Sequence, residues 1–388
     1  VTIPESVTTI GDYAFSYCTS LTSVTIPESV TTIGERVFYH CESLTSVTIP
    51  KSVTTIGMGA FAGCQSLKEI TVDENNNHFV TWNRLLYSKD ITTLYWCPMF
   101  VTLTSVNIPK TTTIIKGYAF YLCKKLYSVT IPESVKEIGR FAFTDCTSLT
   151  SINIPKSVTS LKSGTFENCY NLIEIKIPSS VTTIENDVFR GCKGLTELVL
   201  PSSVVSMNNW LVVGCTNLNK FYIEDGFSPI KIKSMGSMVG AWNNFKELYI
   251  GRSVIVDQNN DFIGDGTGLE EVTFSQFVTS VDDIGMDNAK DLKKVVVCGD
   301  TPPTITDDFF STYQYNNATL YVPEGTTDTY AKATGWRYLY NIVEGMPTGV
   351  SQVESAAKMT VTAGDGCIMV SNAKGEIRVY TSAGTLVK

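Results

Sequence analysis

Hydrophobic residues recur along this chain with a period of 23 residues. The unit is clearest in Leu21–Ser43: Leu, Val and Ile hold its first, fourth and sixth positions before a Pro, and Val-x-x-Ile-Gly, a Phe and a Cys follow. The pattern returns from Leu44 onward. Repeats of 20 to 50 residues are typical of solenoids and propellers. Alternation in the first half of the unit predicts a strand, and stacking of the copies predicts a parallel sheet with strands about 4.8 Å apart.

The copies predict one such strand per coil, and the intervals between strands show where the repeat is interrupted. Strands are expected near residues 21–26, 44–49, 67–72, 103–108, 126–131, 149–154, 172–177, 195–200, 218–223, 245–250, 269–274 and 292–297. The interval between the third and fourth strands is 36 residues instead of 23. Its extra segment, about 73–102, has two alternating runs around Ser88-Lys89-Asp90, which predicts a β-hairpin protruding from the coil.

Both ends of the chain depart from the repeat. Val1–Pro4 matches the end of a strand, so we expect a further coil upstream. The repeated solenoid is expected to end near residue 298, followed by a C-terminal cap over 299–344 that covers the last sheet edge and the apolar core. Residues 345–358 have the Gly, Ser and Pro content of a linker. Residues 359–388 form three short alternating runs, interpreted as the start of a truncated C-terminal β-domain.

Composition and cysteine spacing narrow the classes of partner and cofactor. A net charge of -8 argues against nucleic acid as a partner. No run of 18 apolar residues is present, so no membrane span is expected. Most of the 11 cysteines recur at the 23-residue interval, which predicts a column of small buried side chains rather than disulfides. No C-x-x-C pair occurs, so we expect no zinc site.

The repeat unit L-x-x-V-x-I-P-x-x-V-x-x-I-G-x-x-A-F-x-x-C resembles the BspA-type, or Treponema-type, leucine-rich repeat over about residues 1–344. Residues 359–388 are similar to the opening of C-terminal β-domains on secreted Bacteroidetes proteins. The resemblance implies a right-handed horseshoe of about 23-residue coils with a parallel sheet on its concave face. It also implies a secreted or cell-surface bacterial protein that adheres to host matrix proteins, host cells or other bacteria. The family has no fixed binding motif, so it assigns no residue of this chain.

The outward positions of the strands suggest where a ligand would bind. They carry small Ser, Thr and Asn residues in the N-terminal half, but charged and aromatic residues toward the C-terminus, a mixture that recognition surfaces favour. The candidate binding residues on the concave face are Lys176, Glu197, Lys220, Tyr222, Glu247, Tyr249, Glu271, Thr273 and Lys294. The competing interpretation is that the tyrosines shield a drifting repeat while the charges keep it soluble.

These observations favour a non-enzymatic monomer that binds a protein, such as a host extracellular matrix or bacterial surface protein. A glycan- or mucin-binding module and a structural spacer remain alternatives. The two histidines, His40 and His78, are not in a catalytic motif, and no phosphate-binding loop is present, so no cofactor is expected. Asp257–Asp265 begins like a calcium loop but lacks the Gly and Glu that such a loop requires, so no metal site is expected either.

Overall fold

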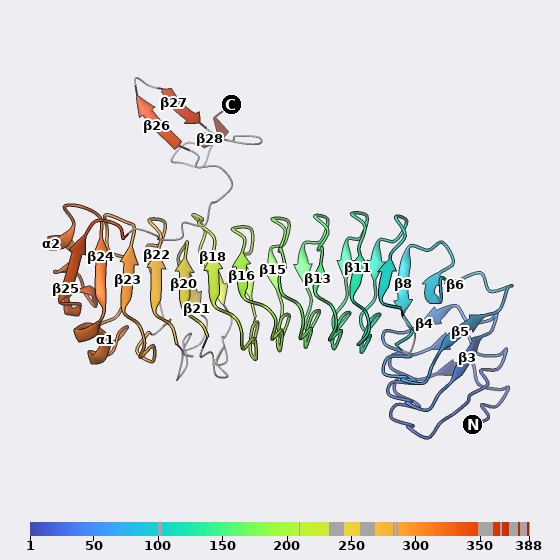
Figure 1. Cartoon of the computed structure of the whole chain (residues 1–388). Helices are drawn as coiled ribbons and strands as arrows, with labels where there is room; N and C mark the ends of the chain where they lie inside the picture. The colour runs from blue at the N-terminus through green and yellow to red at the C-terminus, as the bar shows by residue number, and fades with distance from the viewer. Residues whose placement is uncertain are drawn as a thin grey trace. The chain divides into compact units, whose positions relative to one another are not determined.

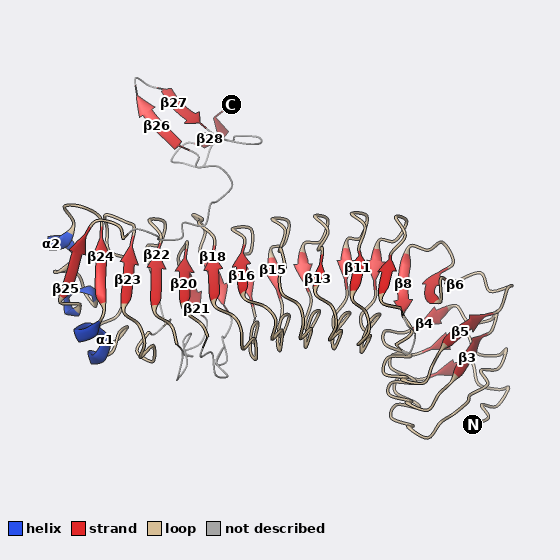
Figure 2. Cartoon of the chain, in the orientation of Figure 1, coloured by secondary structure: helices blue, strands red, loops and turns tan. Residues whose placement is uncertain are grey.

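The chain folds as a β-solenoid of about 13 turns with parallel strands and very little helix (Figures 1 and 2). The computed structural model describes residues 1–99, 103–208, 210–232, 244–256, 268–281, 284 and 286–347, together with four short strands between residues 360 and 387. The chain divides into two compact units, Val1–Gly345 and Met346–Lys388. The first unit contains the solenoid.

The predicted strands form what we call the long-strand sheet, which consists of three separate sections. The first section pairs β3 (Ser46–Ile49) with β5 (Glu69–Val72). The second contains β9 (Ser105–Asn107), β11 (Ser128–Thr130) and β13 (Ser151–Ile152). The third contains β16 (Glu197–Leu200), β18 (Lys220–Ile223), β20 (Glu247–Ile250), β22 (Glu271–Phe274), β23 (Lys294–Val297), β24 (Thr319–Val322) and β25 (Asn341–Glu344).

Two of the expected strands are reduced to single bridges. Residues 21–26 contribute only the bridge from Thr25 to Thr2, and residues 172–177 only the bridge from Lys176 to Asn153. The second case separates β13 from β16 and so divides the long-strand sheet. The predicted alternation is clear in β3, where Val47 is buried between exposed neighbours, and it is lost in β18, β20, β22 and β23, where the last three residues are all buried.

A second set of parallel strands, which we call the short-strand sheet and which also consists of three separate sections, was not predicted. Its strands come from the Val-x-x-Ile half of each unit, and two or three residues are too few to predict a strand from their alternation. They are β1 (Thr9–Ile10), β2 (Thr32–Ile33), β4 (Thr55–Ile56), β10 (Ile114–Ile115), β12 (Glu137–Ile138), β14 (Ser160–Leu161), β15 (Thr183–Ile184), β17 (Ser206–Met207), β19 (Ile230–Ile232) and β21 (Val254–Val256).

Two columns of side chains fill the coil interior, as the sequence predicts. Phenylalanine rings stack in one run from Phe15 to Phe61 and in a second from Phe120 to Phe189, with neighbouring centroids 4.9–5.8 Å apart. The cysteine column is also confirmed. From Cys41 to Cys215 its thiols are buried, and each donates a hydrogen bond to a carbonyl of the preceding coil, for example Cys41 to Phe15 at 3.0 Å; Cys18, the first of the column, is exposed. Burial raises the pKa of the Cys41 thiol to about 11.

The inserted segment contains the predicted hairpin, but the hairpin does not protrude. Strands β7 (Leu85–Ser88) and β8 (Thr93–Trp96) pair antiparallel, and an additional strand, β6 (Phe79–Trp82), pairs with the other side of β7. Leu85, Leu86 and Tyr87 are all buried, because both faces of this sheet are covered. β8 then pairs in parallel with β10 and continues the short-strand sheet. The expectation of a protruding hairpin is therefore corrected: the insert is part of the solenoid wall.

This wall separates two hydrophobic cores. Leu86 and Trp96 belong to the core of the N-terminal coils, whereas Leu85, Tyr87 and Leu94 belong to the core of the later coils. The coils on either side of the insert are also joined directly, by side-chain hydrogen bonds in their turn regions. The residues involved are Arg36, Tyr39, His40, Tyr118 and Tyr121. Gly59 and Gly63 lie between them, and a Cβ at Gly63 would come within 2.7 Å of the His40 ring.

The C-terminal end of the first unit is covered by additional elements. The helices α1 (Thr312–Asn317) and α2 (Thr327–Tyr330) and the 3₁₀ helix η1 (Trp336–Tyr338) lie here, while β24 and β25 extend the long-strand sheet (Figure 2). The buried Trp336 donates its indole N–H to the Pro303 carbonyl at 2.7 Å. Such contacts fit the predicted capping role of 299–344, and the boundary itself stays a prediction.

The second unit has four strands in its described part. β26 (Thr360–Gly364) pairs antiparallel with β27 (Cys367–Ser371), and β28 (Val379–Tyr380) pairs antiparallel with β29 (Leu386–Val387). Most of the predicted linker 345–358 lies outside the described residues.

Candidate functional site

The outward side of the long-strand sheet contains a groove of about 880 Å³. It follows β11, β13, the irregular segment 173–177 and β16. The residues that line it are Ser128, Val129, Thr130, Ser151, Ile152, Asn153, Ile173, Glu174, Ile175, Lys176, Thr196, Glu197 and Val199. Two of the predicted binding residues, Lys176 and Glu197, are among them, and both are exposed.

Local irregularity and small side chains together explain the groove. Asn153 ends the regular pairing of its coil, because its side-chain amide exchanges hydrogen bonds with the backbone of Ile131, at 2.8 and 3.2 Å. On the other side of this coil, the segment 173–177 meets its neighbour through one bridge only, from Lys176 to Asn153. Short side chains such as Ser151 leave space above the backbone of the groove. Ile173, which is 56% exposed, adds an apolar side chain to its lining. This stretch of small residues was not predicted as a site, although the repeated Ser, Thr and Asn at outward positions were a signal for it.

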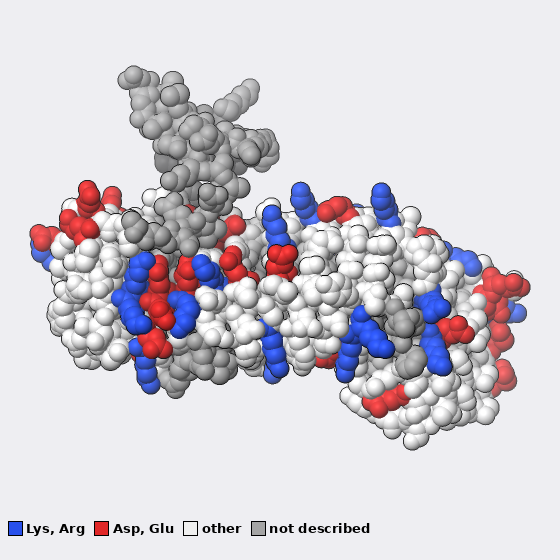
Figure 3. Space-filling view, viewed as in Figure 1, with Lys and Arg blue, Asp and Glu red and all other residues white. Residues whose placement is uncertain are grey.

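The remaining candidate charges lie nearer the C-terminal end of the sheet and pair with one another. Lys220 contacts Glu247 at 2.9 Å, and Lys294 contacts Glu271 at 2.9 Å. The hydrogen bond to Glu247 raises the pKa of Lys220 above its ordinary value. Figure 3 shows basic and acidic side chains interleaved over this region of β20 to β23. The charges offset one another locally, so this region presents no strong field of one sign.

A second row of charges runs beside the first. Lys246 contacts Glu270 at 2.8 Å, and Lys293 approaches the same carboxylate at 4.0 Å. The hydrogen bond from Lys246 lowers the pKa of Glu270. These residues immediately precede β20, β22 and β23, and they were not among the predicted binding residues.

The structure places Tyr222, Tyr249 and Thr273 in one row and buries all three, at 4%, 6% and 3% exposure. The Tyr222 hydroxyl donates to Glu247 at 2.7 Å, and the Tyr249 hydroxyl donates to Asp225 at 2.7 Å. Burial raises the pKa of Tyr249. The two rings lie 6.1 Å apart within the row, so neither presents an open face. Their geometry favours the shielding interpretation for this pair.

His40 and Cys41 do not form an activated nucleophile. His40 faces Tyr121, with its Nε2 atom 3.3 Å from the hydroxyl, and stacks on Tyr17. The neighbouring Cys41 thiol points to the Phe15 carbonyl instead, and its raised pKa disfavours the thiolate. Within the described residues no group of three or more His, Cys, Asp or Glu side chains could hold a metal ion. The calcium-like sequence at Asp257–Asp265 lies outside the described residues.

Parallel strands stacked at a 23-residue interval, with inward Leu, Val and Ile and a cysteine column, define a leucine-rich repeat solenoid. The model of the BspA type leucine-rich repeat region matches residues 1–99, 97–219 and 160–293. The chain therefore belongs to the BspA-type leucine-rich repeat family. No curated protein matches the chain. No helix in the described part of the chain is long and apolar enough to cross a membrane.

Several solved structures are similar. A leucine-rich cell surface protein of Faecalibacterium prausnitzii is 36% identical, with a TM-score of 0.54, over 58% of this chain and 59% of that chain. The match thus spans less than two thirds of that protein. A leucine-rich repeat protein of Bacteroides ovatus is 20% identical over 89% of this chain and 92% of that chain, with a TM-score of 0.47. The pneumococcal vaccine antigen PcpA is 22% identical over 89% of this chain and 67% of that chain, with a TM-score of 0.45.

Proposed function

We propose that this protein is a non-enzymatic binding module, secreted or displayed on the bacterial surface, whose ligand is another protein. The partner class is a host extracellular matrix protein or a bacterial surface protein. The cell-surface description of the Faecalibacterium relative supports the location. The family membership supports a repeat protein whose repeated surface serves recognition rather than chemistry.

The observation that carries the proposal is the groove along β11, β13, 173–177 and β16. Its floor offers hydroxyl and amide groups, Ile173 provides an exposed apolar side chain, and Lys176 and Glu197 add charges of both signs. Protein interfaces combine such apolar contacts with a polar rim. In this proposal Lys220, Glu247, Glu271 and Lys294 form the charged flank of the contact surface. Tyr222, Tyr249 and Thr273 support it from within the sheet.

The test is binding of the purified chain to immobilised fibronectin, fibrinogen, laminin and mucin. We expect saturable binding to one of the three matrix proteins. Ser151→Trp should fill the groove and weaken that binding at least about tenfold, which corresponds to about 1.4 kcal/mol. Thr159→Trp is the matched control, because Thr159 is exposed and does not line the groove. Equal binding by wild type and Ser151→Trp would show that the ligand binds outside the groove.

The same panel separates the alternatives. Binding to mucin alone, lost on removal of its glycans, would replace the protein ligand by a glycan. No binding to any of the four immobilised proteins would contradict the proposal for these ligands and favour a spacer that presents other parts of the protein.

A further inference from the structure

The first break in the long-strand sheet leaves two strand edges beside each other. β5 has β3 on one side and, among the described residues, no paired strand on the other. β6 is the last strand of its own sheet, and it lies next to β5 without pairing with it. Unpaired edges present backbone N–H and C=O groups that can pair with another extended chain.

The backbone direction of β5 is set by the hydrogen bonds on either side. Thr81 donates its hydroxyl across the gap to the Ile70 carbonyl at 2.7 Å, so the backbone of Ile70 points away from β3. Asp73 donates its N–H to Ile49 on the opposite side at 2.9 Å. Because successive residues of a strand alternate in direction, Val72 shares the direction of Ile70. Both residues therefore direct their backbone groups into the gap.

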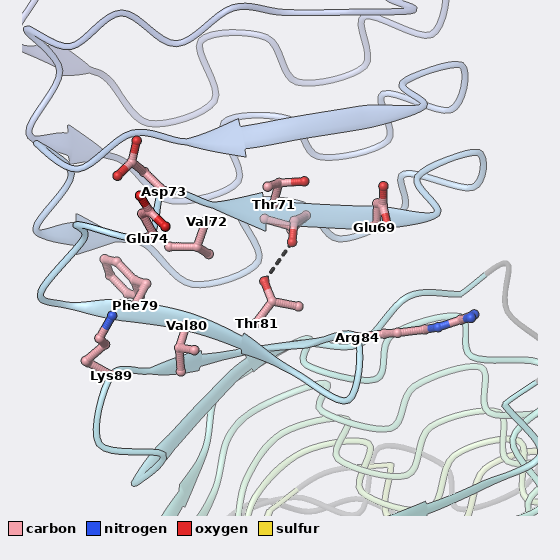
Figure 4. Close-up of a pocket in the computed structure, with 11 residues that line it drawn as sticks. Glu69, Thr71, Val72, Asp73, Glu74, Phe79, Val80, Thr81, Arg84 and Lys89 are labelled. Atoms are coloured by element: carbon pink, nitrogen blue, oxygen red, sulfur yellow. Dashed lines mark hydrogen bonds between the residues drawn. The ribbon is translucent and has the colours of Figure 1, made fainter.

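A pocket of about 320 Å³ occupies this gap (Figure 4). Thr71 and Val72 lie on one side of it and Val80 and Thr81 on the other, so small and partly apolar side chains line its middle. Its charged residues lie at the two ends: Glu69 and Arg84 at one end, and Asp73, Glu74 and Lys89 at the other.

Arg84 has a positive φ angle, which is unusual for an arginine. It is the second residue of the two-residue turn between β6 and β7, where Asn83 and Arg84 have φ angles of 49° and 69°. Such a turn strongly favours Asn-Gly, because positive φ suits glycine. The arginine side chain is therefore held at the end of the pocket at a conformational cost that glycine would avoid.

We propose that this gap is a strand-addition site for an extended peptide segment of a partner protein. The segment pairs with this edge of β5 through Ile70 and Val72, and it replaces the Thr81 hydroxyl at the Ile70 carbonyl. It carries small or apolar residues at its centre, a basic residue at the Asp73 and Glu74 end and an acidic residue near Arg84. Main-chain pairing supplies affinity in this recognition mode, and the side-chain contacts supply specificity. The site is separate from the groove and does not depend on the groove for its function.

The test is a selection of displayed random octapeptides on the wild-type chain, with counter-selection on Val72→Pro. Proline at this position removes the outward N–H but is compatible with an edge strand. We expect surviving peptides with a basic residue toward one end. As synthetic peptides they should slow hydrogen exchange of the Ile70 and Val72 amides at least about tenfold, as new hydrogen bonds require. Peptides N-methylated at alternate residues, in either register, should identify the register whose N–H groups are needed.

Two further variants keep the result interpretable. Arg84→Gly should weaken binding of the selected peptides while leaving the unfolding midpoint unchanged or higher, because glycine relieves the turn. Ser151→Trp, in the groove, should leave peptide binding unchanged. No peptide surviving counter-selection, or peptides that protect amides elsewhere, would overturn the proposal. Association of the chain with itself that Val72→Pro abolishes would replace the partner protein by a second copy of this chain.

Discussion

Asn76 shows how much of the insert depends on one side chain. It is fully buried, and its Nδ2 atom donates to the carbonyls of Pro50 and Val53 at 2.7 and 3.1 Å. Its Oδ1 atom accepts from the N–H groups of His78 and Phe79, both at 2.8 Å. One side chain thus satisfies four backbone groups where the chain leaves the regular repeat. A buried backbone group without a partner costs about 1–3 kcal/mol.

Replacing Asn76 by Ala should therefore lower the free energy of unfolding by about 3 kcal/mol, because several backbone groups lose their partner at once. Urea denaturation followed by circular dichroism would measure it. The matched control is Asn77→Ala, since Asn77 is exposed and should change stability by less than about 0.5 kcal/mol. Equal stability of the two variants would contradict the anchoring role.

The cysteine column leads to a second prediction at this scale. Cys18 is exposed, whereas Cys146 is fully buried and burial raises its thiol pKa well above the ordinary value. Since the thiolate is the reactive form, iodoacetamide at pH 8 should modify Cys18 about 100-fold faster than Cys146 in the folded chain. Peptide mapping by mass spectrometry gives both rates. Denaturant should equalise them, and equal rates without denaturant would contradict a packed column.

At the level of elements, regular strands were predictable and the insert was predictable only in part. Leu, Val and Ile at the first, fourth and sixth positions mark the long strands of the regular coils, such as β3 and β11, although the same residue types at 21–26 and 172–177 form only single bridges. The hairpin at 85–96 follows from its two alternating runs. The burial of Leu85 and Leu86 on opposite faces could not be predicted, because it depends on coils that approach the wall from both sides.

Because the two faces of the wall contact different cores, a substitution on each face should destabilise only the core that it contacts. Leu86→Ala removes contacts from the N-terminal core, and Leu94→Ala removes them from the later core. Each should cost about 3 kcal/mol in the core that it faces. Hydrogen exchange should accelerate in residues 21–72 for the first variant and in 106–161 for the second. Faster exchange in the same residues for both variants would show that the insert does not separate two cores.

At the scale of the solenoid unit, the groove and the ion-paired charges occupy different parts of the outward surface of the long-strand sheet. The ion pairs of Lys220 with Glu247 and Lys294 with Glu271 are partly exposed, so each contributes about 0–1 kcal/mol to stability. Their effect on the surface is to neutralise it. The groove, in contrast, leaves Lys176 and Glu197 exposed beside small polar residues.

Outward positions could be predicted from the alternation, which is why Lys176 and Glu197 were identified from sequence. The groove could not be predicted, because it arises where the segment 173–177 makes only a single bridge to its neighbour although its sequence matches the repeat. The burial of Tyr222 and Tyr249 was not predictable either. It depends on a neighbouring row in which large side chains cover one another, and a single repeat unit does not reveal this row.

The central claim is that a protein ligand lies in the groove, and site-directed photo-crosslinking tests it most directly. p-Benzoylphenylalanine would replace Glu174 in the groove or, as the matched control, Glu137 of β12, which is exposed on the short-strand sheet. Each variant would be irradiated with the matrix protein that gives saturable binding. We predict a covalent complex from position 174 and none from position 137. Cross-linking from position 137 alone would place the ligand on the short-strand sheet and contradict the account.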